Sequence, residues 1–161
     1  MRPLLALFAV ILFTVHSSNA NTRFYRGLDK FIEGSDVVAI VEVGPRDSNW
    51  GYRNPDIKAR YRQLTEAKIK QLLKGKDLSN IAILHGKELD DSLFGQGQGL
   101  YLVFLKHTLD GFVPFDGWPS SKEIKEDRVF GWRTHPYYRH DSGTPLEQVL
   151  SEIADNLRNR N

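Results

Sequence analysis

The chain has no cysteine among its 161 residues. This absence excludes a disulfide framework, a thiolate zinc site, a cysteine nucleophile and the lipid-modified first cysteine of a bacterial lipoprotein. Secreted animal domains usually carry disulfides, so an exported domain without cysteine is typical of a bacterial periplasm or its surroundings.

A strong excess of charge of one sign is also missing. The sequence has 22 basic and 20 acidic residues, a formal net charge of +2. Such a balance gives no electrostatic basis for holding nucleic acid or an anionic membrane through the release of counterions. We therefore expect neither of these among the partners.

Long hydrophobic runs are confined to the N-terminus. Arg2 supplies a short positive region, Leu4 to Val15 form an apolar run, and Ser18 to Ala20 give a small-x-small cleavage pattern. A membrane-spanning helix needs about 20 apolar residues, and this run is shorter. The sequence therefore predicts that residues 1–20 are a cleaved signal peptide and that residues 21–161 form one periplasmic or secreted domain without a membrane span.

Short β-branched and apolar runs separated by turn residues predict strands along the mature chain. The clearest is Val37–Val43, which lies between Gly34 and Gly44-Pro45. The other predicted strands are Ile81–Leu84, Leu100–Leu105, Gly111–Phe115 and Arg128–Trp132.

The stretch from Tyr61 to Leu73 is ambiguous. Leu64, Ala67 and Leu72 fit one face of a helix, whereas a position between two strands and the Lys-Gly that follows Leu73 favour a long edge strand. Both alternatives stay open, so the sequence predicts five or six strands.

Two helices are expected, one at each end of the mature chain. Apolar residues from Phe24 to Ile32 recur at helical spacing and predict a short lid helix that Gly34 ends. Near the C-terminus, Thr144 is predicted as N-cap, with Pro145 at the first helical position and Glu147 completing a capping box. One apolar face of this helix comprises Leu146, Val149, Leu150, Ile153 and Leu157.

This arrangement describes an α+β, mostly β domain. Strand alternation and helical spacing predict a shared core made by six residues from two strands and the last helix. They are Val38, Ile40, Leu102, Phe104, Leu150 and Ile153.

Three segments together resemble a known family. Ser35–Val43 after a lid helix, Leu72–Gly75, and Gly97–Leu105 before a C-terminal amphipathic helix resemble exported bacterial domains with the OB-like barrel of tissue inhibitors of metalloproteinases. The resemblance implies a five- to six-stranded OB-like barrel whose groove and loops suit an extended or polymeric ligand. The inhibitory chemistry of that family uses an N-terminal cysteine, and this chain has none.

A catalytic site has little support in the sequence. No Gly-x-Ser-x-Gly elbow occurs, and no cofactor motif is recognised. The one local cluster of metal-ligating residue types is His135, His140 and Asp141, and Pro136 breaks any helix that could align the two histidines. A small exported metal-dependent hydrolase that uses this cluster is the alternative hypothesis.

Aromatic residues in predicted loops and at strand ends give the leading functional hypothesis. Rings with a polar tip beside guanidinium groups are common in contact surfaces, although such rings also close the ends of barrels. The candidate binding residues are Trp50, Tyr52, Arg53, Trp118, Trp132, Tyr137 and Tyr138. We therefore predict an exported, non-enzymatic binding or accessory domain that recognises a protein or polymeric partner.

Overall fold

The computed structural model describes much of the chain after residue 26. The described residues are 27–47, 50, 61, 63–85, 94, 97–116, 120–132 and 141–159. The predicted signal peptide lies outside them. Within these ranges, no helix is both long and apolar enough to cross a membrane.

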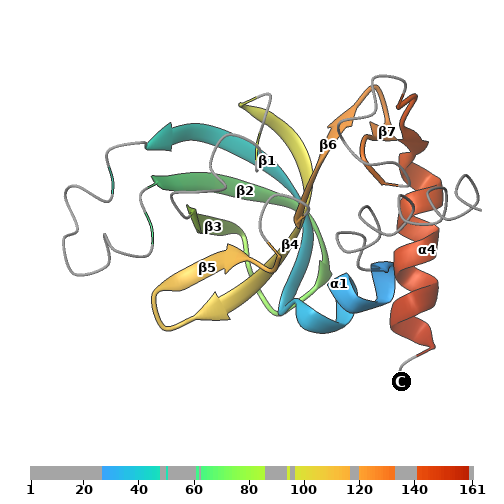
Figure 1. Cartoon of the computed structure of the whole chain (residues 1–161), viewed down its shortest axis with the longest axis horizontal. Coiled ribbons are helices and arrows are strands. Elements are labelled where there is room, and N and C mark those ends of the chain that lie inside the picture. The colour runs from blue at the N-terminus through green and yellow to red at the C-terminus, as the bar shows by residue number, and fades with distance from the viewer. Residues whose placement is uncertain are drawn as a thin grey trace, which may run out of the picture.

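Five strands form a closed barrel (Figure 1). They are β1 (Val37–Asp47), β2 (Gln63–Lys74), β3 (Asn80–His85), β4 (Gly99–Thr108) and β5 (Gly111–Pro114). Their order is β1-β2-β3-β5-β4, and β4 pairs back with β1 to close the barrel. The β3–β5 pair is parallel and the other neighbours are antiparallel. This mixed barrel confirms the predicted α+β, OB-like fold class.

Further elements extend one side of the barrel. They are the strands β6 (Ser121–Lys125), β7 (Arg128–Val129) and β8 (Thr144–Pro145) and the helices α1 (Leu28–Gly34) and α4 (Leu146–Arg158). The sheet continues from β4 through β6 and β7 to β8. Figure 1 shows α1 and α4 on one side of the barrel, with β2 and β3 toward the other side.

Two cores share the strands β1 and β4. The barrel interior contains Val37, Ala39, Val41 and Val43 of β1, which alternate with residues that face the helices. Because both faces of these strands are buried, their sequences are nearly continuous apolar runs.

The second core lies between the barrel wall and the helices. It contains Val38, Ile40, Leu102, Phe104 and Ile153, with the partly buried Leu150 packed against them. The six residues predicted to share one core are therefore together, and that prediction is confirmed.

The segment that was ambiguous in the sequence is a strand, but it is not an edge strand. β2 pairs with β1 on one side and with β3 on the other. Its register against β1 shifts between Val38 and Ala39 and again between Ile40 and Val41. Each shift changes the alternation of inward and outward residues, which removes the period of two from the sequence of β2.

The sequence predicted that Gly44-Pro45 ends the first strand, and this prediction is wrong. β1 continues to Asp47 because a bulge accommodates the two residues, between the register pairs Val43–Ala67 and Arg46–Thr65. A bulge allows a strand to bend without losing its partner.

The predicted capping box of the last helix is wrong. Pro145 is the N-cap, no side chain caps the helix, and Thr144 belongs to β8, where it pairs with Val129. The backbone N–H of Leu146 donates instead to the carbonyl oxygen of Asp127 at 2.9 Å. A carbonyl from another element thus satisfies one of the free N–H groups at the start of the helix.

The predicted strand Arg128–Trp132 is shorter than expected, and the strands β6 and β8 were not predicted. Only Arg128 and Val129 are in strand conformation, while the three residues after them form a turn. In β6, Ile124 is the single buried residue, so the sequence shows little apolar alternation there.

Candidate functional site

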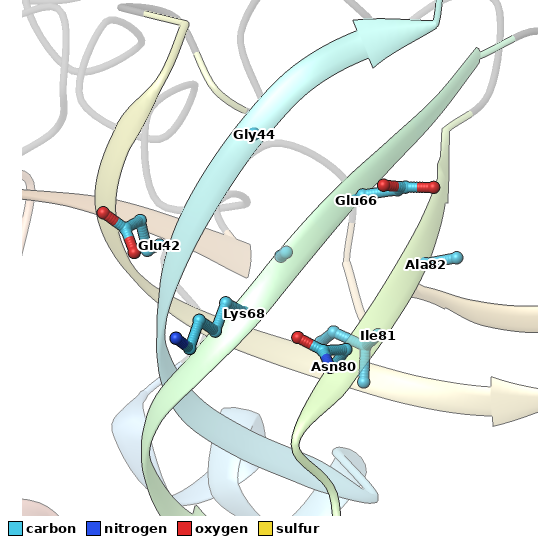
Figure 2. Close-up of a pocket in the computed structure, with 8 residues that line it drawn as sticks. Glu42, Gly44, Glu66, Lys68, Asn80, Ile81 and Ala82 are labelled. Atoms are coloured by element: carbon cyan, nitrogen blue, oxygen red, sulfur yellow. The ribbon is translucent and has the colours of Figure 1, made fainter.

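An open groove of about 540 Å³ lies on the outer surface of β1, β2 and β3 (Figure 2). On the outer face of β1, Val38 and Ile40 are covered by the helices, whereas Glu42, two residues further on, is exposed. The groove therefore begins where the helical layer ends. Its lining residues are Glu42, Gly44, Glu66, Ala67, Lys68, Asn80, Ile81 and Ala82.

The register of the strands places the groove residues in rows across the sheet. Lys68 of β2 lies opposite Glu42 of β1 and opposite Asn80 of β3. One row further along, Glu66 lies opposite Ala82. Residues opposite one another in adjacent strands share a face, so these polar side chains project from one surface.

Short side chains make this part of the surface hollow. Ala82 carries only a methyl group, and Gly44 has no side chain, while the longer side chains of Glu66 and Lys68 rise beside them (Figure 2). A Cβ atom at Gly44 would lie 3.2 Å from the carbonyl oxygen of Glu66, closer than most such contacts. The bulge thus brings β1 and β2 so close together that glycine is favoured at this position.

The groove holds charges of both signs. Lys70 Nζ lies 2.7 Å from Glu42 Oε2, and its hydrogen bond and positive charge lower the pKa of Glu42, with a smaller attraction from Lys68. In the described part of the chain, neither Glu66 nor Lys68 forms an ion pair. These two exposed side chains can therefore pair with charges on another molecule.

The described lining residues give the groove charged and polar groups. It presents two carboxylates, an ammonium group and an amide, without a hydroxyl, thiol or imidazole that could act as a nucleophile beside a base. No group of three or more potential metal-ligating side chains occurs among the residues described.

Trp132, one of the candidate binding residues, is buried. Its exposed fraction is 7%, its ring stacks on Phe104 at 6.4 Å between centroids, and its Nε1–H donates to Glu152 Oε2 at 2.9 Å. Trp132 therefore packs in the core beneath α4. It is not exposed for contact with a partner.

Most of the other candidate binding residues are not among the residues that the structure describes. Trp50, predicted to lie in a loop, is helical and half-buried, three residues after the end of β1. Outside the described residues lie Tyr52, Arg53, Trp118, Tyr137 and Tyr138.

Asp141, the carboxylate of the alternative metal cluster, is engaged with the backbone. Its Oδ2 accepts a hydrogen bond from the N–H of Gly131 at 2.5 Å, and its Oδ1 accepts one from Gly143 at 2.8 Å. These bonds organise the turn before α4. His135 and His140 lie outside the described residues.

Sequence reasoning missed the groove. A signal existed in Glu42, the one charged residue within the apolar run of β1, and in the alternation of Thr65, Glu66, Ala67 and Lys68. That alternation indicates an exposed face only once the segment is known to be a strand, and its helical alternative was open.

Comparison with known proteins gives no relative. No protein-family model matches the chain, no curated protein matches it, and no solved structure matches it. The description of the barrel as OB-like depends on its strand order and on the parallel pairing of Ile83 in β3 with Phe112 in β5. The resemblance to the barrel of metalloproteinase inhibitors stays a prediction from the sequence.

Proposed function

We propose that this protein is an exported, non-enzymatic binding domain that holds an extended segment of a partner protein in the groove over β1, β2 and β3. The observation that carries the proposal is the open groove itself, with the exposed charges of Glu66 and Lys68, which form no ion pair among the described residues. OB-type barrels commonly bind extended ligands on the face of their second and third strands, which supports this choice of surface.

The charges of the groove define the chemistry of the partner segment. A basic side chain fits beside Glu66 and an acidic one beside Lys68, two residues away on the same strand. Successive side chains on one face of an extended chain are also two residues apart. A partner segment with an acidic and a basic residue at positions i and i+2 therefore matches the groove.

Some of the aromatic residues predicted to bind a partner are close in sequence to this surface. Trp50 follows closely after β1, whose residue Glu42 lines the groove. Aromatic side chains at the rim of a charged groove add apolar contact area that charges alone do not supply.

Export is the second half of the proposal. It is supported by the positively charged start, the short apolar run and the cleavage pattern that ends at Ala20. The intact mass of the protein recovered from the periplasm or medium tests it, because export by this route leaves a chain that begins at Asn21. A recovered mass that retains Met1 would contradict it.

Binding is tested with peptides selected on the immobilised protein from a random display library. We expect the selected peptides to carry acidic and basic residues two positions apart. We expect Glu66→Lys and Lys68→Glu each to weaken their binding about tenfold, or about 1.4 kcal/mol, in fluorescence anisotropy titrations. Added salt weakens binding to the unsubstituted protein, since the charges are exposed.

Lys125→Glu is the matched control, because Lys125 is exposed on β6 at a distance along the sheet from the groove. It has the same change in net charge as Lys68→Glu and should leave binding unchanged. Equal effects of the two substitutions would mean that binding depends on the net charge of the protein and not on the groove. Selection of purely apolar peptides, or binding of neutral oligosaccharides in the groove, would overturn the proposed partner chemistry.

A further inference from the structure

A second cavity, of about 270 Å³, lies on the inner side of the same barrel wall. It is at the end of the barrel where β1 finishes and β2 begins. Its lining residues are Val43, Gly44, Pro45, Arg46, Thr65, Phe94, Gly97 and Gln98. Val43 and Thr65 face the barrel interior, whereas Glu42 and Glu66 face outward into the groove, so the bulged wall separates the two sites.

The hydroxyl group of Thr65 is the unusual feature of this cavity. Thr65 is 1% exposed, and its Oγ1 has no hydrogen-bond partner within the described ranges. A buried polar atom without a partner costs folding free energy, and valine would fill the same space without that cost. Because Thr65 also lines the cavity, its hydroxyl group is close enough to serve a ligand bound there.

Arg46 provides a positive charge next to this hydroxyl. It lies directly opposite Thr65 in the register of β1 and β2, so the two side chains share a face. Its Nη2 donates to the carbonyl oxygen of Phe94 at 3.4 Å, which is long for a hydrogen bond. The remaining N–H groups of a guanidinium suit the two oxygens of a carboxylate.

The rest of the cavity is largely apolar. Phe94 is 1% exposed and packs edge-on against Tyr101, with 5.0 Å between ring centroids, and Val43 belongs to the interior core. The ligand thus meets an apolar wall on one side and two hydrogen-bond donors on the other. The cavity is also smaller than the roughly 300 Å³ at which sites for drug-sized ligands begin.

From these observations we propose that the cavity binds a small monocarboxylate with an apolar body. The guanidinium of Arg46 pairs with the carboxylate, the hydroxyl of Thr65 donates a hydrogen bond to one of its oxygens, and Phe94 contacts the apolar part. This site lies on the other side of the bulged wall from the outer groove, and Gly44 lines both.

The test is a titration of the protein with benzoate, followed through the backbone amide signals in NMR spectra. We expect saturable shifts at Arg46, Thr65 and Gln98, with a dissociation constant of about 1 mM or below. Benzamide has the same size without the charge, and we expect it to bind at least tenfold more weakly. Equal binding of benzamide, or an absence of saturable shifts at these residues, would overturn the proposal.

Two variants of Thr65 separate binding from folding. Thr65→Val should weaken benzoate binding about tenfold and raise the melting temperature of the free protein by about 2 to 8 °C, because it removes an unpaired buried hydroxyl. Thr65→Ser retains the hydroxyl and should retain binding. A lower melting temperature for Thr65→Val would show that the hydroxyl serves the fold, and would overturn its role as a ligand group.

Arg46→Gln and Lys68→Glu complete the test. The first should weaken benzoate binding at least tenfold, since it removes the charge partner. The second changes the outer groove and should leave benzoate binding unchanged. If Lys68→Glu has the same effect as Arg46→Gln, benzoate responds to the general charge of the protein, and the proposed cavity site is overturned.

Discussion

At the scale of single residues, Lys74 has a structural role that the sequence did not indicate: it holds the end of a helix. Its Nζ donates to the carbonyl oxygens of Ile32 at 2.6 Å and Ser35 at 2.5 Å, at the C-terminal end of α1. Ser35 Oγ donates to the carbonyl oxygen of Phe31 at 2.6 Å. The last carbonyl groups of a helix have no partner within it, and a cation there also complements the helix dipole. The Lys-Gly at the end of β2 thus fastens the lid helix to the barrel.

Replacement of this lysine tests that role. Lys74→Met keeps much of the side-chain volume but removes the three N–H donors, so we expect a loss of about 1 to 3 kcal/mol in the free energy of unfolding, measured by urea denaturation. Lys76→Met is the control, because Lys76 is exposed two residues away. We expect it to change stability by no more than about 0.5 kcal/mol. Equal effects of both substitutions would contradict the capping role.

Lys122 makes stability depend on pH. Burial lowers its pKa from 10.5 to about 8, and attraction to Asp141 opposes only part of this shift. In the folded protein Lys122 therefore releases its proton near pH 8, whereas in the unfolded chain it keeps the proton until about pH 10.5. The unfolded state binds more protons between these values, so this group makes the free energy of unfolding rise with pH from about 8 to 10.5.

Lys122→Met removes this contribution. Below pH 8 the charged lysine opposes folding, so we expect the variant to be at least as stable as the unsubstituted protein at pH 7, and its advantage to shrink as the pH approaches 10.5. Urea denaturation of both proteins at several pH values measures the difference. An advantage that is the same at pH 7 and at pH 10 would contradict the lowered pKa.

At the scale of elements, the sequence predicted well those strands whose pattern is uninterrupted. β1, β3 and β4 appear as apolar runs because one or both of their faces are buried, and the six predicted core residues lie together. β2 stayed ambiguous because the three register shifts between β1 and β2 occur in the paired structure and not in the residue types. The cap of α4 was predicted wrongly for a similar reason, since pairing with Val129 commits Thr144 to a strand.

The helix-covered core gives a matched test on one strand. Phe104 is 1% exposed and packs edge-on against Phe31, with 5.3 Å between ring centroids. We expect Phe104→Ala to lower the free energy of unfolding by about 3 to 5 kcal/mol in chemical denaturation. Leu100, on the same face of β4, is 39% exposed, so Leu100→Ala should cost much less. Similar losses for the two would mean that the helices do not protect this face.

At the scale of the whole molecule, structural and binding roles are divided along single strands. The outer face of β1 is covered by helices at Val38 and Ile40 and becomes the floor and wall of the groove from Glu42 to Gly44. The fold class followed from apolar patterning, whereas the groove depends on which strands are neighbours. The chemistry of a partner therefore follows from the groove and not from the barrel, since one fold carries many functions.

The last prediction concerns the rings after β1. The segment that contains Trp50 and Tyr52 is rich in polar residues, glycine and proline, a composition typical of surface loops that serve recognition. We therefore expect Trp50→Ala combined with Tyr52→Ala to weaken binding of the selected peptides at least tenfold, while the melting temperature falls by less than about 3 °C. Trp132→Ala is the control for a buried ring and should lower stability by about 3 to 5 kcal/mol. If the double variant is destabilised as strongly as Trp132→Ala, the two rings close the end of the barrel, and peptide recognition must depend on the charges of the groove alone.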